Sequence, residues 1–139
     1  MNTIHTAAAG VLTASAVYVG GWASLAPRSF YDSFPGFNRM WVGGDGPYNE
    51  HLIRDVGGLY LALAITGVLA LVWRDRRTTL LLGAAWTVFA VPHLAYHLHH
   101  LAGMDTVDIV GNVVALGGTL VLALVLLVPE RNVRTEVAR

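Results

Sequence analysis

Four long apolar runs constrain the fold of this chain more than any other feature of its sequence. They cover approximately residues 6–26, 52–73, 79–98 and 107–128. Each is close to the roughly 20 apolar residues that an α-helix needs to cross the hydrocarbon core of a bilayer. Strands of a membrane barrel would instead show alternating hydrophobicity over about ten residues, and the sequence has no such pattern. The sequence therefore predicts an all-α bundle of four transmembrane helices.

Composition leads to the same class of protein. Only 13% of the 139 residues are charged, whereas 55% are hydrophobic. An ordinary soluble domain has about a quarter charged residues, and a small one leaves much of its chain at the surface. A soluble globular domain is therefore excluded, and the absence of cysteine excludes a disulfide-stapled one. Basic and acidic residues number nine each, so nucleic acid is not an expected partner. We expect a single transmembrane domain over residues 1–139.

The arginines predict the orientation of the helices in the membrane. The short connection at residues 74–77 reads Arg-Asp-Arg-Arg, and the tail beyond residue 128 carries three more arginines. Four spans place both segments on the same side, which the positive-inside rule assigns to the cytoplasm. Both termini are then cytoplasmic. The long connection at residues 27–49 and the short one at residues 99–106 face outward.

Histidines at the outward ends of the second and third spans predict a metal site. At about 100° per residue, His93, His97 and His100 form one stripe on the third span. Two imidazoles four residues apart can share a metal ion, and His51 and Asp55 of the second span complete the expected ligand set. Imidazole and carboxylate suit iron, copper or zinc, with a heme held by His51 and a third-span histidine as a variant. The alternative is that these histidines are interfacial and structural.

Acidic residues at the outward ends of the spans are candidates for catalysis, because ionisable groups near membrane depth are costly. Glu50 and Arg54 are four residues apart and share a helix face. We expect Glu50, Arg54, Asp55 and Asp108 to act in acid–base chemistry. The alternative for Glu50 and Asp108 is a favourable interaction of an acid in the first turn with the helix dipole.

Two further polar features lie on the outward side. Asp105 is expected to cap the N-terminus of the fourth span, and Asn112 to hydrogen-bond with neighbouring helices. The connection at residues 27–49 is rich in aromatic residues and long enough to be functional. It is expected either to form a lid over the polar cluster or to anchor the chain at the lipid headgroups.

Several features resemble known membrane proteins. Four spans, cytoplasmic termini and a glycine-rich second helix resemble the DoxX-like group of small bacterial membrane proteins. Two segments, FYDSFPGFNRMWVGGDGPYNEHLIRDVGGLYLAL and VPHLAYHLHHL, more closely resemble an uncharacterised family of bacterial four-helix membrane proteins. This resemblance implies the fold and the bacterial plasma (inner) membrane, and it brings no established activity. DoxX is linked to a thiosulfate:quinone oxidoreductase, but no motif here carries that activity across.

A second resemblance is to the histidine boxes of membrane di-iron desaturases and hydroxylases. It rests on the His93 and His97 spacing together with the His99–His100 pair. Those enzymes use more histidines, in three separated boxes, than the six of this chain.

Three functions are compatible with these patterns. The first is a metal-dependent membrane oxidoreductase that acts on a lipid, a quinone or another lipophilic molecule. The second is a non-enzymatic accessory subunit or lipid-binding bundle within a homo-oligomer or larger membrane complex. The third is a metal-free isomerase in which Asp55 or Glu50 moves protons on a lipophilic substrate.

Overall fold

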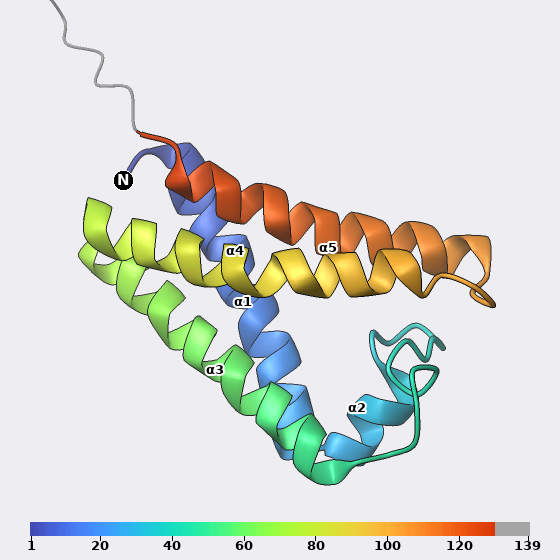
Figure 1. Ribbon diagram of the computed structural model, residues 1–139. Coiled ribbons are helices and arrows are strands. Elements are labelled where there is room, and N and C mark those ends of the chain that lie inside the picture. Colours follow the sequence, from blue (N-terminus) through green and yellow to red (C-terminus); the bar gives the residue numbers. More distant parts are fainter. Residues whose placement is uncertain (130–139) are drawn as a thin grey trace, which may run out of the picture.

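The computed structural model describes residues 1–129 and is helical apart from its connections (Figure 1). Its helices are α1 (Thr3–Leu25), α2 (Pro27–Ser33), α3 (Glu50–Trp73), α4 (Arg76–His99) and α5 (Thr106–Leu127). Helices α1, α3, α4 and α5 are each long and apolar enough to cross a membrane. The predicted all-α fold with four membrane spans is therefore confirmed. The tail arginines Arg131, Arg134 and Arg139 lie outside the described residues.

Each long helix begins at an Asn or Asp whose side chain caps its first turn. The caps are Asn2, Asn49, Asp75 and the predicted Asp105, which accepts a 2.8 Å hydrogen bond from the backbone N–H of Asp108. Such caps satisfy backbone donors that the helix itself leaves unpaired. The observed helices start one to three residues before the predicted spans, because polar first turns do not register as hydropathy.

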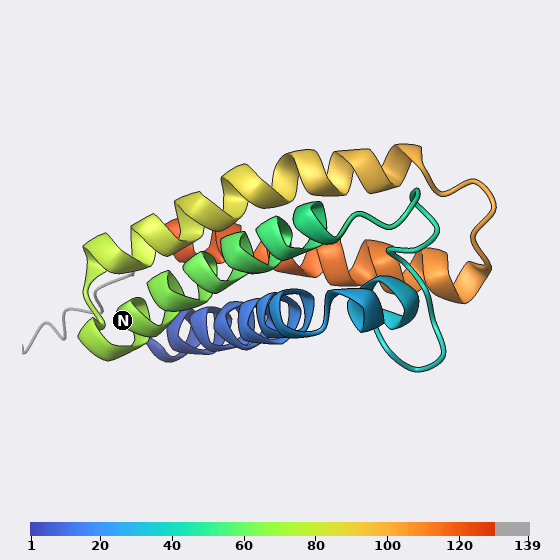
Figure 2. The ribbon, with the colours of Figure 1, turned by 90° about the horizontal axis from the view of Figure 1, so that it is seen from below.

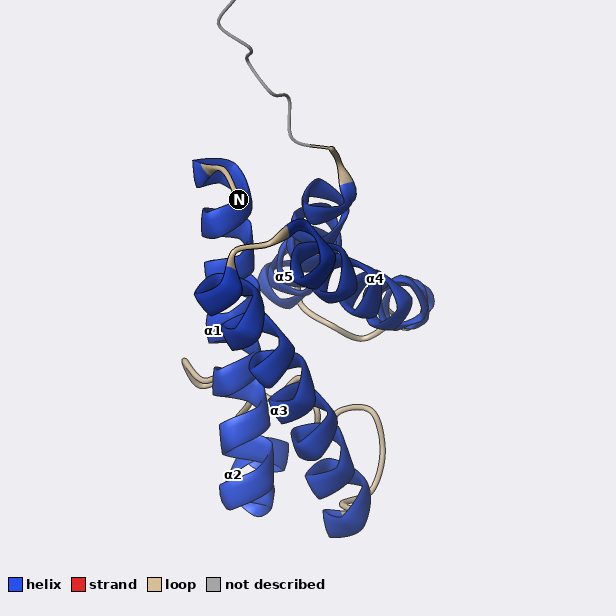
Figure 3. Cartoon of the chain, turned by 90° about the vertical axis from the view of Figure 1, so that its left-hand side faces the viewer, coloured by secondary structure: helices blue, strands red, loops and turns tan. Residues whose placement is uncertain are grey.

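The long helices form two antiparallel pairs, α1 with α3 and α4 with α5. Glycine permits the close approach of the first pair, since a Cβ on Gly57 of α3 would overlap the side chain and backbone nitrogen of Ser24 in α1. Figure 3 shows α4 and α5 nearly end-on, while α1 and α3 run from the top toward the bottom of the picture. The two pairs therefore cross instead of lying parallel.

Polar contacts hold the helix ends together at one end of the bundle. The Arg76 guanidinium donates to the carbonyl oxygens of Leu126 and Leu127 at 2.8 and 2.7 Å, which satisfies acceptors at the C-terminus of α5. The amino group of Met1 lies 3.3 Å from the carbonyl oxygen of Arg74. The N-terminus, the basic connection and the end of α5 thus share one end of the bundle (Figure 1). We call it the inner end, because the positive-inside rule predicts that it faces the cytoplasm.

Packing differs between the inner and outer halves. The main core is built largely of alanines with the fully buried Leu12, Leu82, Trp86 and Leu126. Toward the outer end the pairs separate, and α2 and the connection after it lie between them (Figures 1 and 2). Apolar side chains such as Val88, 75% exposed, cover the outside of the bundle, as expected of a surface solvated by lipid.

Candidate functional site

The connection at residues 27–49 contains a short helix and an ordered loop. Pro27 opens α2 at its first position, where a missing backbone N–H costs nothing. Phe30 of α2 is 4% exposed and packs against the rings of Trp22 and Phe34, with centroids 5.9 and 4.7 Å away. We call residues 34–49, which follow α2, the strap. The connection that is expected to form a lid or an anchor therefore begins with a folded, aromatic segment.

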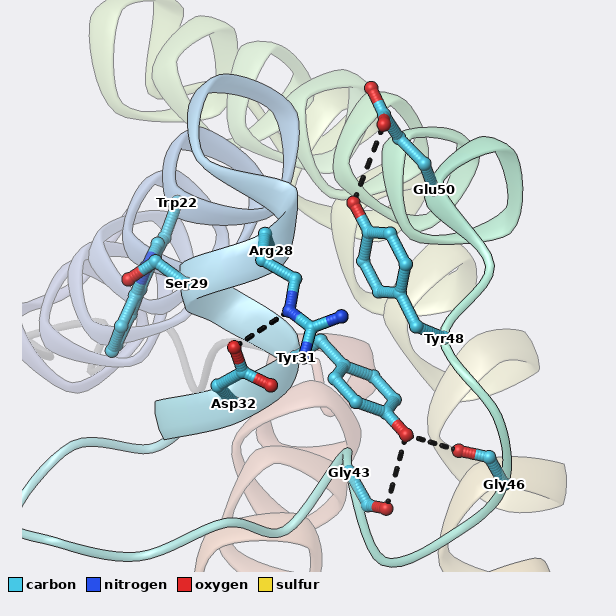
Figure 4. Close-up of polar contacts among 9 residues, drawn as sticks. All are labelled: Trp22, Arg28, Ser29, Tyr31, Asp32, Gly43, Gly46, Tyr48 and Glu50. Atoms are coloured by element: carbon cyan, nitrogen blue, oxygen red, sulfur yellow. Dashed lines mark hydrogen bonds and ion pairs between the residues drawn. The ribbon is translucent and has the colours of Figure 1, made fainter.

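Polar contacts fasten the strap to α2 (Figure 4). The Tyr31 hydroxyl donates to the carbonyl oxygen of Gly46 at 2.6 Å, with that of Gly43 at 3.4 Å. Arg28 lies over the rings of Tyr31 and Tyr48, at 5.6 and 5.0 Å from their centroids, which is cation–π distance. These contacts fix the C-terminal half of the strap.

A second set of contacts fastens the strap to the start of α5. The Arg39 guanidinium lies 2.7 Å from the carboxylate of Asp105 and 3.2 Å from that of Asp108. The Trp41 indole N–H donates to Asp108 at 2.8 Å. The backbone N–H of Asp108, and then Arg39, lower the pKa of Asp105 below its usual value. Asp108, a predicted catalytic residue, thus holds the strap in this structure.

A cavity of about 770 Å³ lies between the helix pairs, from the middle of the bundle to the strap. Its volume is in the range of small-molecule binding sites, about 300–1,000 Å³. Its aromatic lining residues are Tyr18, Phe30, Tyr31, Phe34, Trp41, Tyr48, Tyr60 and Trp86. Its polar lining residues are Ser15, Asp45, Asn49, His93, His97, Asn112 and Thr119. Aliphatic residues such as Val56 and Leu116 complete the lining, so the cavity is mostly apolar.

Two buried polar atoms, in side chains that line the cavity, lack a hydrogen-bond partner among the described residues. They are Nε1 of Trp86 and Oδ1 of Asn112, in side chains that are 1% and 2% exposed. Leaving such an atom unpaired costs about 1–3 kcal/mol, so native proteins have few of them. The expectation that Asn112 hydrogen-bonds with neighbouring helices is not met by its oxygen. Both atoms belong to side chains that line the cavity.

The predicted histidine stripe divides at the outer end of α4. His93 and His97 both line the cavity, and their ring centroids are 4.8 Å apart. His100 follows the end of the helix; its Nδ1 lies 2.7 Å from the carbonyl oxygen of Tyr96, on whose ring it stacks. The cavity therefore receives two of the three imidazoles.

The predicted pairs on α3 form, but outside the cavity. His51 Nε2 lies 3.4 Å from Asp55, and the two side chains are 88% and 58% exposed. Arg54 donates to Glu50 at 2.9 Å and to the carbonyl oxygen of Ser24 at 2.5 Å. None of the four α3 side chains is among the residues that line the cavity. These four side chains therefore pair with one another and with α1 near the start of α3, and they do not form a common site with His93.

The expected metal ligands are consequently spread over two surfaces. Within residues 1–129, no group of three or more His, Asp or Glu side chains is close enough together to hold a metal ion. His93 and His97 supply two imidazoles, whereas His51 and Asp55 point from an exposed part of α3. Iron, copper, zinc or heme binding stays a prediction.

Sequence reasoning missed the deepest polar residue of the site. Trp86 lies near the middle of α4, although tryptophan in membrane helices is enriched at the interfaces. A tryptophan in the middle of a membrane span is therefore unusual, and this position was a signal available in the sequence. For Asn112, the signal was an amide inside an apolar run, which marks a functional candidate by default.

The fold and the site together define a multi-pass helical membrane protein with a ligand-sized cavity in its outer half. No family model, curated protein or solved structure matches the chain. The resemblance to DoxX-like proteins stays a prediction.

Proposed function

We propose that the protein binds a lipophilic small molecule reversibly in the cavity between its helix pairs. The observation that carries this proposal is that two unpartnered atoms, Trp86 Nε1 and Asn112 Oδ1, belong to side chains that line one cavity. A ligand with polar groups offsets the cost of leaving these atoms unpaired.

The lining supports a lipophilic ligand. Aromatic and aliphatic residues together make up most of the wall, and among the described residues Asp45 is the only Asp, Glu, Lys or Arg that lines it. A mostly apolar wall with a few placed polar groups is typical of small-molecule sites. The cavity also lies within the membrane-spanning part of the bundle, so a molecule dissolved in the outer leaflet is the natural source of the ligand.

Binding, without a chemical step, is the function we assign. The predicted catalytic residues Glu50, Arg54 and Asp55 lie outside the cavity, and Asp108 holds the strap. The proposal corresponds to the lipid-binding alternative of the sequence analysis. The protein then stores, transfers or presents its ligand to a partner in the bacterial inner membrane.

A cavity-blocking variant tests this function. Ala115 on α5 lines the cavity, so Ala115→Trp places an indole ring inside it and narrows it, whereas Ala62→Trp adds the same side chain to an exposed position of α3 outside the cavity. Each purified protein is incubated in nanodiscs with lipid extracted from bacterial membranes. Small molecules retained by the protein are then extracted and counted by mass spectrometry against empty nanodiscs.

We expect about one specific molecule per wild-type protein, retained by Ala62→Trp and lost from Ala115→Trp. The same extract from wild-type protein and from empty nanodiscs would refute the proposal. So would equal retention by wild-type protein and Ala115→Trp.

A further inference from the structure

The depth of Trp86 in the bundle indicates which chemical group the ligand carries at the end that enters the cavity first. Trp86 is ten residues from the start of α4 and thirteen from its end. At about 1.5 Å per residue, its backbone lies about 15 Å from the inner end of the helix and about 20 Å from the outer end. The indole N–H is therefore near the middle of the membrane-spanning region.

The Trp86 ring is held by neighbouring aromatic side chains. Tyr60 and Phe89 pack edge-on against it, with ring centroids 6.0 and 6.1 Å away. Edge-to-face contacts of this kind stabilise a ring in one orientation. Its N–H has no acceptor among residues 1–129, although the side chain is 1% exposed and lines the cavity.

An indole nitrogen only donates, so the ligand atom that satisfies it must be an acceptor. At this depth a charged group is strongly disfavoured, which excludes a carboxylate or an ammonium. The chemistry that remains is a neutral oxygen, as in a ketone, an ether or an alcohol. An ordinary phospholipid does not fit, because its polar head stays at the membrane surface.

Asn112 provides a second hydrogen-bonding position, nearer the outer end of the cavity. Gly83 of α4 lies against Ala123 of α5, and the two helices are antiparallel. Asn112 is eleven residues outward from Ala123, whereas Trp86 is three residues outward from Gly83. The difference of eight residues is about 12 Å along the bundle. A ligand that reaches Trp86 therefore passes the Asn112 amide.

From this arrangement we infer that the ligand is a neutral lipophilic molecule that enters oxygen first and accepts a hydrogen bond from Trp86 Nε1. The inference rests on the proposed function and adds the chemical class of the ligand.

Fluorenone and fluorene test the inference, because they differ in a carbonyl against a methylene group. Binding of each to protein in nanodiscs is measured by equilibrium dialysis against empty nanodiscs, which corrects for partition into lipid. One hydrogen bond predicts that wild-type protein binds fluorenone about three- to tenfold more tightly than fluorene. Trp86→Phe is expected to bind both equally, whereas Trp73→Phe, at an exposed position outside the cavity, keeps the preference.

The carbonyl stretch of bound fluorenone provides a readout that does not depend on the folding of a variant. A hydrogen bond from Trp86 lowers its frequency in wild-type protein relative to fluorenone in empty nanodiscs. Equal affinity for the two compounds together with an unshifted carbonyl overturns the inference and leaves the proposed function intact. Binding of neither compound, with no lipid retained in the extraction experiment, overturns both.

Discussion

The attachment of the strap to α5 leads to the most quantitative prediction. Asp108→Ala removes the acceptor of the Trp41 indole N–H at 2.8 Å and a carboxylate 3.2 Å from Arg39. Hydrogen bonds to charged groups contribute about 1.5–3 kcal/mol, and the Asp108 side chain is 20% exposed, so most of this value applies. The pair of Arg39 with Asp105, whose side chain is 59% exposed, contributes at most about 1 kcal/mol and remains in the variant.

We therefore expect Asp108→Ala to favour release of the strap by about 2 kcal/mol, or roughly 30-fold. Hydrogen–deuterium exchange of protein in nanodiscs, followed over strap peptides by mass spectrometry, measures this directly. The backbone N–H of Trp41, bonded to the carbonyl oxygen of Phe34 at 2.7 Å, is the most informative amide. Its exchange is expected to accelerate by about the same factor.

Two control variants separate the attachment from general effects of charge. Asp108→Asn keeps an oxygen for Trp41 and is expected to give a smaller acceleration. Asp32→Ala removes an exposed partner of Arg28, in a pair with side chains 66% and 42% exposed, and is expected to change little. Unchanged strap exchange in Asp108→Ala, or equal acceleration in Asp32→Ala, would show that our reading of the attachment is wrong.

Three further predictions concern packing, pH and metal. The Cβ of Gly57→Ala would meet the backbone of α1, so this variant is expected to destabilise the bundle by about 1–3 kcal/mol in denaturant titrations. Gly58→Ala adds its Cβ in open space and is expected to be neutral or stabilising. Equal effects of the two variants would contradict the close approach of α1 and α3. The pKa of Asp105 is lowered in the folded protein, so its contribution to strap attachment is complete above its unfolded pKa of about 3.9 and is lost as the pH falls through the lower folded pKa. Tryptophan emission is therefore expected to change below about pH 4 and to stay constant between about pH 5 and 8, and a change confined to that neutral range would count against this assignment. Treatment with a chelator is expected to leave ligand retention unchanged, and a loss that iron, copper or zinc restores would instead support a metal site at His93 and His97.

The sequence was sufficient for the helices and for local pairs. Apolar length predicted the four spans, and the Asp105 cap and the His51–Asp55 pair follow from spacings of three and four residues. Such spacings report which residues share a helix face. They do not report where that face points, which is why His51 and Asp55 are exposed instead of meeting His93.

The cavity was beyond sequence reasoning because it depends on contacts between distant segments. Arg39 and Asp105 are 66 residues apart, and no local pattern predicts that they pair. The space beside Trp86 exists because the helix pairs separate, which depends on packing along whole helices. Polar residues inside apolar runs were the available signal, and Asn112 gave it.

The short connection between α3 and α4 has a mechanical consequence. It joins the two helix pairs covalently at the inner end, because α3 ends at Trp73 and α4 begins at Arg76, while at the outer end the pairs are joined through the strap and α2. A molecule built this way is wider at its outer end than at its inner end (Figure 1). Lateral pressure from the surrounding lipid then acts most strongly on the separated outer ends of the two pairs.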